Sequence, residues 1–276
     1  MPHIIESKKN PRGFLHTLEN SPKHIAFIMD GNRRFAQKQG KETVWGHQKG
    51  MTVIENILHW AYLAKVKHIT IYAFSTENFN RDSAEVDSIF ELLEDSLRRI
   101  LNDEKILRKN IKIRMIGESE NIPQNALSVL RELEEKTEAN SKMYLNIALA
   151  YGGRNDIAQA FEKIAASAGN KNSEKVLISD EEISQYLFPY SDEIVPSVDL
   201  LIRTGNEHRT SNFLPWQANG NNAIVCYYEK FWPEFNFKDL FYLLRRYQKV
   251  EKERHLKNEK RLKKVNAFLN DVSGKE

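Results

Sequence analysis

Six short apolar runs, separated by stretches with helical periodicity, constrain the fold of this 276-residue chain more than any other feature. The runs are rich in Ile, Val and Tyr and are bounded by polar or turn-forming residues, which is typical of buried strands. They are His24–Asp30, His68–Phe74, Ile111–Gly117, Met143–Leu149, Val198–Thr204 and Ala223–Tyr227.

Between most of these runs, apolar residues recur three and four positions apart, which predicts amphipathic helices over 50–65, 84–101, 123–140 and 154–168. Nearly continuous apolar strands that alternate with helices predict an α/β fold, with a six-stranded, mainly parallel sheet flanked by helices. The polar segment Gly169–Lys175 is interpreted as a surface loop rather than a linker. With no internal repeat, the chain is expected to form a single domain.

The composition favours a cytoplasmic protein. No apolar stretch approaches the ~20 residues that a membrane span requires, and the first residues lack the apolar core of a secretory signal. The only cysteine, Cys226, lies in the apolar run AIVCYY. A buried, inert thiol is therefore expected there rather than a nucleophile.

The net charge of +3 hides a basic segment near the C-terminus. Residues 245–265 contain ten Lys and Arg against three Glu, so the rest of the chain carries about −4. This pattern is typical of a solvated helix end. It is also compatible with peripheral association with anionic lipid or with a phosphorylated substrate. Nucleic-acid binding is disfavoured, because the basic residues are not interleaved with aromatic ones.

Chemistry is expected where the strands end, because open parallel sheets bind ligands outside the carboxyl ends of their strands. The first run ends in Asp30 and Gly31, and Asn32, Arg33 and Arg34 follow at a predicted helix start. A tight turn at Gly31, free helix amides and two arginines would suit a phosphate group. An aspartate beside phosphate makes sense if Mg²⁺ bridges them. A helix cap with two surface arginines is the plainer alternative.

Two further runs end in polar residues. The second run leads into Ser75, Thr76 and Glu77, which could equally begin a capped helix. The fifth run ends at Arg203, with Arg209 six residues later. Arginines on a tight loop could converge on one anion, although a solvated loop would look the same. Together the three strand ends predict a pocket for two phosphate-bearing ligands.

Five segments, in order, resemble the motifs of the cis-prenyltransferase family, to which undecaprenyl diphosphate synthases belong. They read HIAFIMDGNRRFAQKQG with GHQKG, ITIYAFSTENFNR, LNIALAYGGRNDI, VDLLIRTGNEHRTSNFLPWQ and FWPEF. The resemblance divides the chain into an N-terminal extension (1–22), a catalytic domain (23–248) and a basic C-terminal helical tail (249–276).

The resemblance implies a homodimer whose sheet is not of the Rossmann type, and a hydrophobic tunnel between two helices and the sheet. It also implies Mg²⁺-dependent condensation of isopentenyl diphosphate with an allylic prenyl diphosphate. In such enzymes the allylic diphosphate leaves, and the double bond of isopentenyl diphosphate attacks the carbocation-like centre. Loss of a proton then gives a cis double bond.

The resemblance also implies roles for single positions. Asp30 resembles the aspartate that binds Mg²⁺ and diphosphate, and Asn78 matches the position proposed to help take the proton. The allylic diphosphate site is matched by Gly31, Asn32, Arg33, Arg34 and His47, with Phe35 packed beside it; Ser75, Thr76 and Glu77 line the junction, Phe79 and Arg81 lie at the boundary of the two substrates, and Arg203, Arg209, Thr210 and Ser211 match the clamp for the homoallylic diphosphate.

Product length depends on the side chains that close the tunnel. The candidates are Ala73, Ile89, Phe90 and Met143.

The chain departs from the family pattern at several positions. Arg33 and Asn206 stand where the family usually has glycine, and Thr43 stands where it usually has arginine. The family also has a glutamate that helps bind Mg²⁺ a few residues after the Trp-Gln pair. Counting forward from that pair reaches Asn222, and counting back from the later Trp-Pro pair reaches Ile224, so neither position is acidic.

These departures leave three functional alternatives. The first is an ordinary chain elongator with altered metal coordination. The second is a divergent enzyme that joins prenyl units irregularly, in the head-to-middle manner of lavandulyl-type synthases, or that cyclises a prenyl diphosphate. The third is a non-catalytic prenyltransferase subunit, which the retained Asp30, Asn78, Arg203 and Arg209 disfavour.

Overall fold

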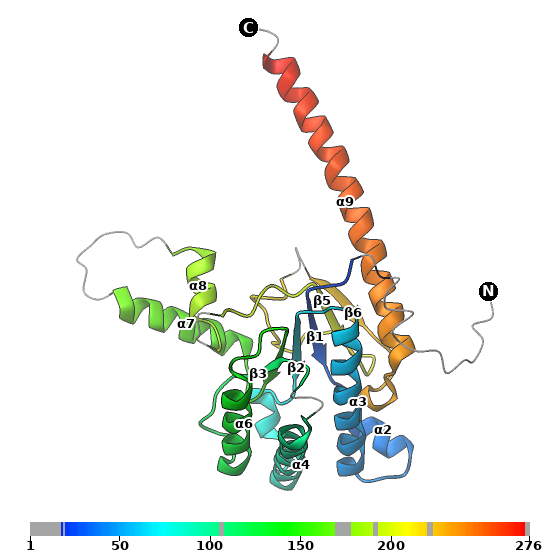
Figure 1. Ribbon diagram of the computed structural model, residues 1–276, viewed down its shortest axis with the longest axis vertical. Coiled ribbons are helices and arrows are strands. Elements are labelled where there is room, and N and C mark those ends of the chain that lie inside the picture. The colour runs from blue at the N-terminus through cyan, green and yellow to red at the C-terminus, as the bar shows by residue number, and fades with distance from the viewer. Residues whose placement is uncertain are drawn as a thin grey trace, which may run out of the picture.

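A computed structural model describes residues 18, 20–104, 108–168, 178–189, 193–219 and 223–273, without the side chains of 267–273. The segment Gly169–Lys175, predicted to be a loop, lies outside these ranges, as does Asn222. The α/β prediction is confirmed, and Figure 1 shows the central sheet with its flanking helices.

All six predicted strands are present in one sheet, and every neighbouring pair runs parallel. The sheet order is β3-β4-β2-β1-β5-β6, which differs from the Rossmann order. The strands are β1 (His24–Ile28), β2 (His68–Tyr72), β3 (Ile111–Ile116), β4 (Met143–Ala148), β5 (Leu200–Arg203) and β6 (Ile224–Tyr227).

The four predicted helices are also present, as α3 (Thr43–Leu63), α4 (Ser83–Asn102), α6 (Gln124–Thr137) and α7 (Gly153–Ala168). Helix α3 begins seven residues before the predicted boundary at residue 50, and its early glycines let α2 pack closely. A Cβ at Gly46 would collide with the backbone carbonyl of Asn32. The other helical elements are α2 (Asn32–Lys38), η1 (Thr76–Asn80), α8 (Asp180–Tyr186), η2 (Trp232–Glu234) and α9 (Phe237–Ser273).

Both faces of the sheet are covered, which explains why its strands lack polar alternation. Along β1, Ile25 and Phe27 join a large core cluster beneath α3, α4, α6 and α9. The intervening Ala26 and Ile28 join a smaller cluster on the opposite face. Cys226 is 1% exposed, and burial raises the pKa of its thiol. The predicted buried cysteine is therefore confirmed.

Helix α9 packs its first turns on the sheet through Leu240, Leu243 and Leu244. It continues without a break past residue 248, where the catalytic domain was expected to end, and projects from the body of the molecule (Figure 1). Among the described residues, no helix combines the length and apolar character needed to cross a bilayer.

Candidate active site

The three central strands, β1, β2 and β5, end side by side at one edge of the sheet. Their exits carry Asp30, Ser75 and Arg203, so parallel pairing brings together the three strand ends singled out in the sequence. A cavity of about 970 Å³ opens there.

The cavity has a polar mouth and an apolar interior. Its inner wall is formed by α3, α4, β2 and β4, which agrees with the tunnel that the resemblance implies. In the sheet register, Ala148 of β4 pairs with Tyr72 of β2, which pairs with Ile28 at the carboxyl end of β1. Leu145, which also lines the cavity, lies three residues before Ala148 on β4. The interior therefore extends from the carboxyl edge of the sheet toward its amino edge. The apolar lining includes Ile54, Ile71, Leu93, Leu97, Ile100, Leu145, Ile147 and Leu149.

Asp30 is fixed at the mouth by its own backbone. Its amide donates to Thr204 Oγ1 at 3.0 Å, and its carbonyl accepts from the same hydroxyl at 2.8 Å. Gly31 then turns the chain at a φ of 106°, in the region that favours glycine. A Cβ there would lie 2.7 Å from the ring of Phe231, so side chains are excluded from this turn.

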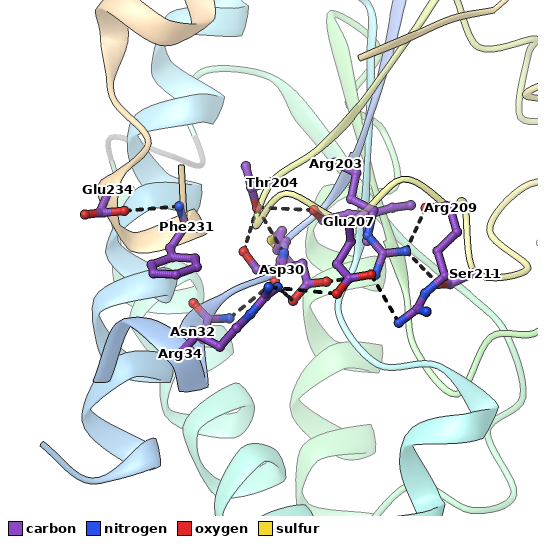
Figure 2. Close-up of polar contacts among 12 residues, drawn as sticks. Asp30, Asn32, Arg34, Arg203, Thr204, Glu207, Arg209, Ser211, Phe231 and Glu234 are labelled. Atoms are coloured by element: carbon purple, nitrogen blue, oxygen red, sulfur yellow. Dashed lines mark hydrogen bonds and ion pairs between the residues drawn. The ribbon is translucent and has the colours of Figure 1, made fainter. Parts of the chain in front are cut away.

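Two arginines bracket the Asp30 carboxylate, one on each oxygen (Figure 2). Arg34 Nη2 donates to Oδ1 at 3.0 Å, and Arg203 Nη2 donates to Oδ2 at 2.8 Å. Arg203 is only 4% exposed, whereas the Arg34 side chain is more than a third exposed. Positive charge therefore flanks Asp30 from both the α2 side and the β5 side of the mouth.

The β5 side forms a compact clamp. Arg203 Nη1 donates to the carbonyl of Arg209 at 2.7 Å and to Ser211 Oγ at 2.6 Å. These bonds fold the loop back, so Arg209, Thr210 and Ser211 all line the cavity. Asn206, which replaces a family glycine, adopts a φ of 57°, a conformation that asparagine tolerates better than most residues.

Glu207 connects the two sides of the mouth and was missed as a site residue by the sequence reasoning. One carboxylate oxygen lies 3.8 Å from Arg34 and the other 3.4 Å from Arg209. It lines the cavity together with these arginines. The only sequence signal was its place inside the RTGNEHR motif.

The β2 exit holds Asn78 and Glu77 at the cavity wall. The Asn78 side-chain oxygen accepts from the Ser75 amide at 3.1 Å, which caps η1. Glu77 accepts from Asn212 at 3.3 Å. Burial raises the pKa of Glu77, but hydrogen bonds from its own amide and from nearby polar side chains outweigh burial and leave that pKa lowered.

His47 of α3 reaches the cavity with an unpaired polar atom. Its Nε2 is buried without a hydrogen-bond partner. Burial, reinforced by Arg81 and Arg33, lowers its pKa to about 4. His47 is therefore a neutral hydrogen-bonding group near pH 7 and not a further cation.

Three predicted substrate-binding residues do not line the cavity. Phe35 stacks on Trp45 with 5.4 Å between ring centroids, and Phe79 packs edge-on against Phe74 at 4.8 Å. The Thr76 hydroxyl bonds to the adjacent Glu77. The other predicted site residues line it: Asp30, Gly31, Asn32, Arg33, Arg34, His47, Ser75, Glu77, Asn78, Arg81, Arg203, Arg209, Thr210 and Ser211.

Of the four residues predicted to close the tunnel, two line the cavity and two do not. Ala73 and Ile89 line the cavity. Phe90 and Met143 do not, because both are buried in the core cluster, where Phe90 packs on Phe74. Periodicity identifies a buried helix face but does not separate cavity wall from core. Residues that sequence reasoning left out also contribute to the wall: Gly50, Arg154, Glu207, Asn212, Pro215 and Trp232.

Asp30 is the carboxylate at this mouth for which the sequence predicts a metal ion. No cluster of three or more His, Cys, Asp or Glu that could hold a metal occurs in the part of the chain described here. Ile224 is one of the two positions at which the family glutamate was sought, and it does not line the cavity. It lies three positions before Tyr227, the residue that pairs with Arg203 in the sheet. A bridging Mg²⁺ would nevertheless fit Asp30, since protein-bound Mg²⁺ often takes one or two carboxylates, with phosphate oxygens and water completing its shell.

Comparison with known proteins agrees with the fold. Residues 28–255 match the family model described as putative undecaprenyl diphosphate synthase. The chain belongs to the cis-prenyltransferase family. The matched region contains the strand exits that form the cavity mouth, and it extends seven residues beyond the expected end of the catalytic domain.

Curated relatives within this family share about two fifths of the sequence. A tritrans,polycis-undecaprenyl-diphosphate synthase (geranylgeranyl-diphosphate specific) of Methanosarcina mazei is 41% identical, covering 90% of this chain and 83% of the relative. The synthase of the same name from Archaeoglobus fulgidus is 42% identical, covering 82% and 89%.

Solved structures of the family have the same fold. Lavandulyl diphosphate synthase from Lavandula x intermedia superposes with a TM-score of 0.75 at 32% identity, covering 83% of this chain and 95% of that one. A probable undecaprenyl diphosphate synthase from Campylobacter jejuni gives a TM-score of 0.67 at 26% identity, covering 83% and 96%.

Proposed function

We propose that this protein is a prenyl-chain elongating enzyme that condenses isopentenyl diphosphate with an allylic prenyl diphosphate to give a cis-prenyl diphosphate. The observation that carries the proposal is the pair of cationic sites on either side of Asp30. Arg33 and Arg34 lie on one side, and Arg203 and Arg209 lie on the other. An enzyme that joins two diphosphates needs two such sites.

The apolar interior supports the same reading. A substrate with its diphosphate at the α2 side can extend its hydrocarbon chain between α3, α4 and the sheet, where the walls are aliphatic. Burial of this chain in an apolar cleft contributes binding energy without polar contacts. Isopentenyl diphosphate, which is short, would occupy the β5 clamp.

The reaction breaks the allylic C–O bond, and the electron pair leaves with the diphosphate. Arg34, the amides after Gly31 and the neutral His47 would stabilise the charge on that leaving group. Mg²⁺ held by Asp30 would supply further charge neutralisation when bound. The double bond of isopentenyl diphosphate, fixed by Arg203 and Ser211, then forms the new C–C bond.

A proton must leave the isopentenyl unit to complete the reaction, and the diphosphate released in the first step can accept it. Ser75 and Asn78, which line the cavity, are proposed to lie beside the carbon that loses this proton. The capping bond from the Ser75 amide holds the Asn78 side chain in place. We assign Asn78 to positioning at this step, since a neutral amide is a poor base.

The allylic substrate is proposed to be a C20 all-trans diphosphate. This choice rests on the printed names of the archaeal relatives, which are geranylgeranyl-diphosphate specific. We further propose that the active form is a homodimer acting in the cytoplasm.

Purified protein with Mg²⁺, labelled isopentenyl diphosphate and each of the C5, C10, C15 and C20 allylic diphosphates tests the proposal. We expect incorporation of several isoprene units, most efficiently with the C20 substrate, and product masses that increase by whole units. A single coupling with an irregular skeleton, or a cyclised product without added units, would overturn chain elongation. No turnover with any substrate would overturn the enzymatic assignment.

A further inference from the structure

The distal half of α9 has no partner in the part of the chain that the structure describes. Every residue from 255 to 266 is exposed, although the same helix is buried at Leu243, Leu244 and Tyr247. Burial ends near the amino edge of the sheet. Burial, reinforced by the nearby charge of Asp199, raises the pKa of Tyr247, and Asp199 accepts from the amide of His24, the first residue of β1.

The charge on this helix is concentrated on one side. At ~100° per residue, the ten basic residues fall within an arc of about 200°. The side of the helix that continues the stripe of Leu240, Leu244 and Tyr247 carries Glu251, Asn258, Leu262 and Val265. Arg254 and Arg261 lie at the border between this side and the arc, and one acidic residue, Glu253, lies within the arc. We call the arc the basic face: Arg245, Arg246, Lys249, Lys252, Arg254, Lys257, Lys260, Arg261, Lys263 and Lys264.

The basic face is poorly suited to a nucleic acid whose bases stack on protein side chains. It contains no aromatic side chain on which a base could stack. Toward one edge of the basic face is Leu256, which is 49% exposed and has Lys249, Lys252, Lys260 and Lys263 around it at helical spacing. An aliphatic side chain among long cationic ones suits the headgroup layer of a bilayer, where lysine stems also lie against apolar material.

We propose that the basic face of α9 docks this protein on the surface of a bilayer that contains anionic lipid. The apolar interior of the cavity extends toward the amino edge of the sheet, and α9 projects past that same edge. Docking therefore places the end of the prenyl chain that is distal to its diphosphate on the bilayer side. This last point rests on the proposed function, whereas docking itself does not.

The test is co-sedimentation of the full-length protein with phosphatidylcholine vesicles that contain or lack phosphatidylglycerol. The test variant is Lys257→Gln/Lys260→Gln/Lys263→Gln. The control variant, Lys41→Gln/Lys49→Gln/Lys67→Gln, removes the same charge from exposed lysines off the helix. Circular dichroism confirms that both variants fold.

We expect binding only to anionic vesicles, weakened by salt. Since each lysine near an anionic surface contributes a factor of about 5, the test variant should bind roughly 100-fold more weakly and the control as the wild type does. Equal binding to neutral vesicles, no binding, or equal loss in both variants would overturn the proposal. Tighter binding to RNA than to vesicles at the same salt would assign the face to nucleic acid, and a change in sedimentation mass of the test variant would assign it to a second copy. Because the readout requires no turnover, the outcome is independent of the enzymatic proposal.

Discussion

Arg203 and Asp30 form an ion pair of 2.8 Å between the ends of two neighbouring parallel strands. Arg203 is almost fully buried, while about three tenths of the Asp30 side chain is exposed to the cavity. In this pair the arginine is held in the protein interior, whereas the carboxylate remains accessible from the cavity. This arrangement fixes the carboxylate that would contact Mg²⁺ and keeps a cation within reach of the second diphosphate.

Asp30→Asn should nearly abolish turnover. The substitution keeps the shape of the side chain but removes the charge that would hold Mg²⁺, a contribution of several kcal/mol, or at least ~100-fold in rate. The fold should survive, with unfolding free energy lower by about 1–3 kcal/mol because Arg203 loses one partner. Steady-state kinetics and thermal unfolding measure both effects. Asp87→Asn, on an exposed position of α4, is the control. A turnover within threefold of wild type would remove Asp30 from the mechanism.

The sheet could be predicted from the sequence because each strand is buried on both faces. Such a strand has a nearly continuous apolar sequence, which is easy to recognise. The sequence was also sufficient to place the active-site edge, since the ends of parallel strands share that edge. Local patterns could not give the side-chain directions. Phe35 and Asn32 belong to the same short helix, yet Asn32 lines the cavity and Phe35 stacks on Trp45 outside it.

Glu207 illustrates a second limit. A carboxylate in a phosphate-binding loop has no obvious role until its neighbours are known. The structure places it between Arg34 and Arg209, which are 175 residues apart in sequence. Long-range charge pairs of this kind leave no periodic signal, so they became visible only once the fold was known.

Arg209→Ala should mainly weaken binding of isopentenyl diphosphate. The side chain is 68% exposed and its one ion pair among the described residues is with Glu207, so it is available to a ligand. Loss of one charge-assisted contact of about 2 kcal/mol should raise KM for isopentenyl diphosphate roughly 30-fold. Arg98→Ala, which removes an exposed ion pair of α4, should leave both KM values unchanged. An effect confined to the allylic substrate would mean that the two sites are reversed.

Acid should destabilise the protein through His24. This residue is fully buried, with Nδ1 2.9 Å from the Pro196 carbonyl and Nε2 2.7 Å from the Thr70 hydroxyl. Burial lowers its pKa to about 4, from 6.5 in the unfolded chain. The unfolded state therefore binds more protons between pH 6.5 and 4. The stabilisation is fully present above pH 6.5 and falls by about 3 kcal/mol as the pH drops to 4.

Urea unfolding of the wild type and of His24→Gln between pH 7.5 and 4 measures this contribution. The variant should show a shallower loss of stability on acidification, whereas His255→Gln, on the exposed part of α9, should follow the wild type. The comparison is necessary because burial raises the pKa of Asp156 to about 6, which acts in the opposite direction. Identical pH dependence in wild type and His24→Gln would exclude His24 as the source.

Mg²⁺ should bind the free enzyme weakly and the substrate complex more tightly. Both oxygens of Asp30 are already paired with arginines, and the described residues contain no group of three or more His, Cys, Asp or Glu side chains that could hold a metal ion. A site completed by diphosphate oxygens forms only when substrate is present. Calorimetric titration with and without a non-reactive diphosphate analogue should show that Mg²⁺ binds more tightly in the presence of the analogue.

Asn222 lies outside the described residues, and Asn222→Glu would supply an acid where the family has one. This variant should lower the Mg²⁺ concentration needed for half-maximal activity, whereas Asn222→Gln should not. Tight Mg²⁺ binding by the unmodified free enzyme would show that another carboxylate, such as Glu207 or Glu229, already serves as the second ligand.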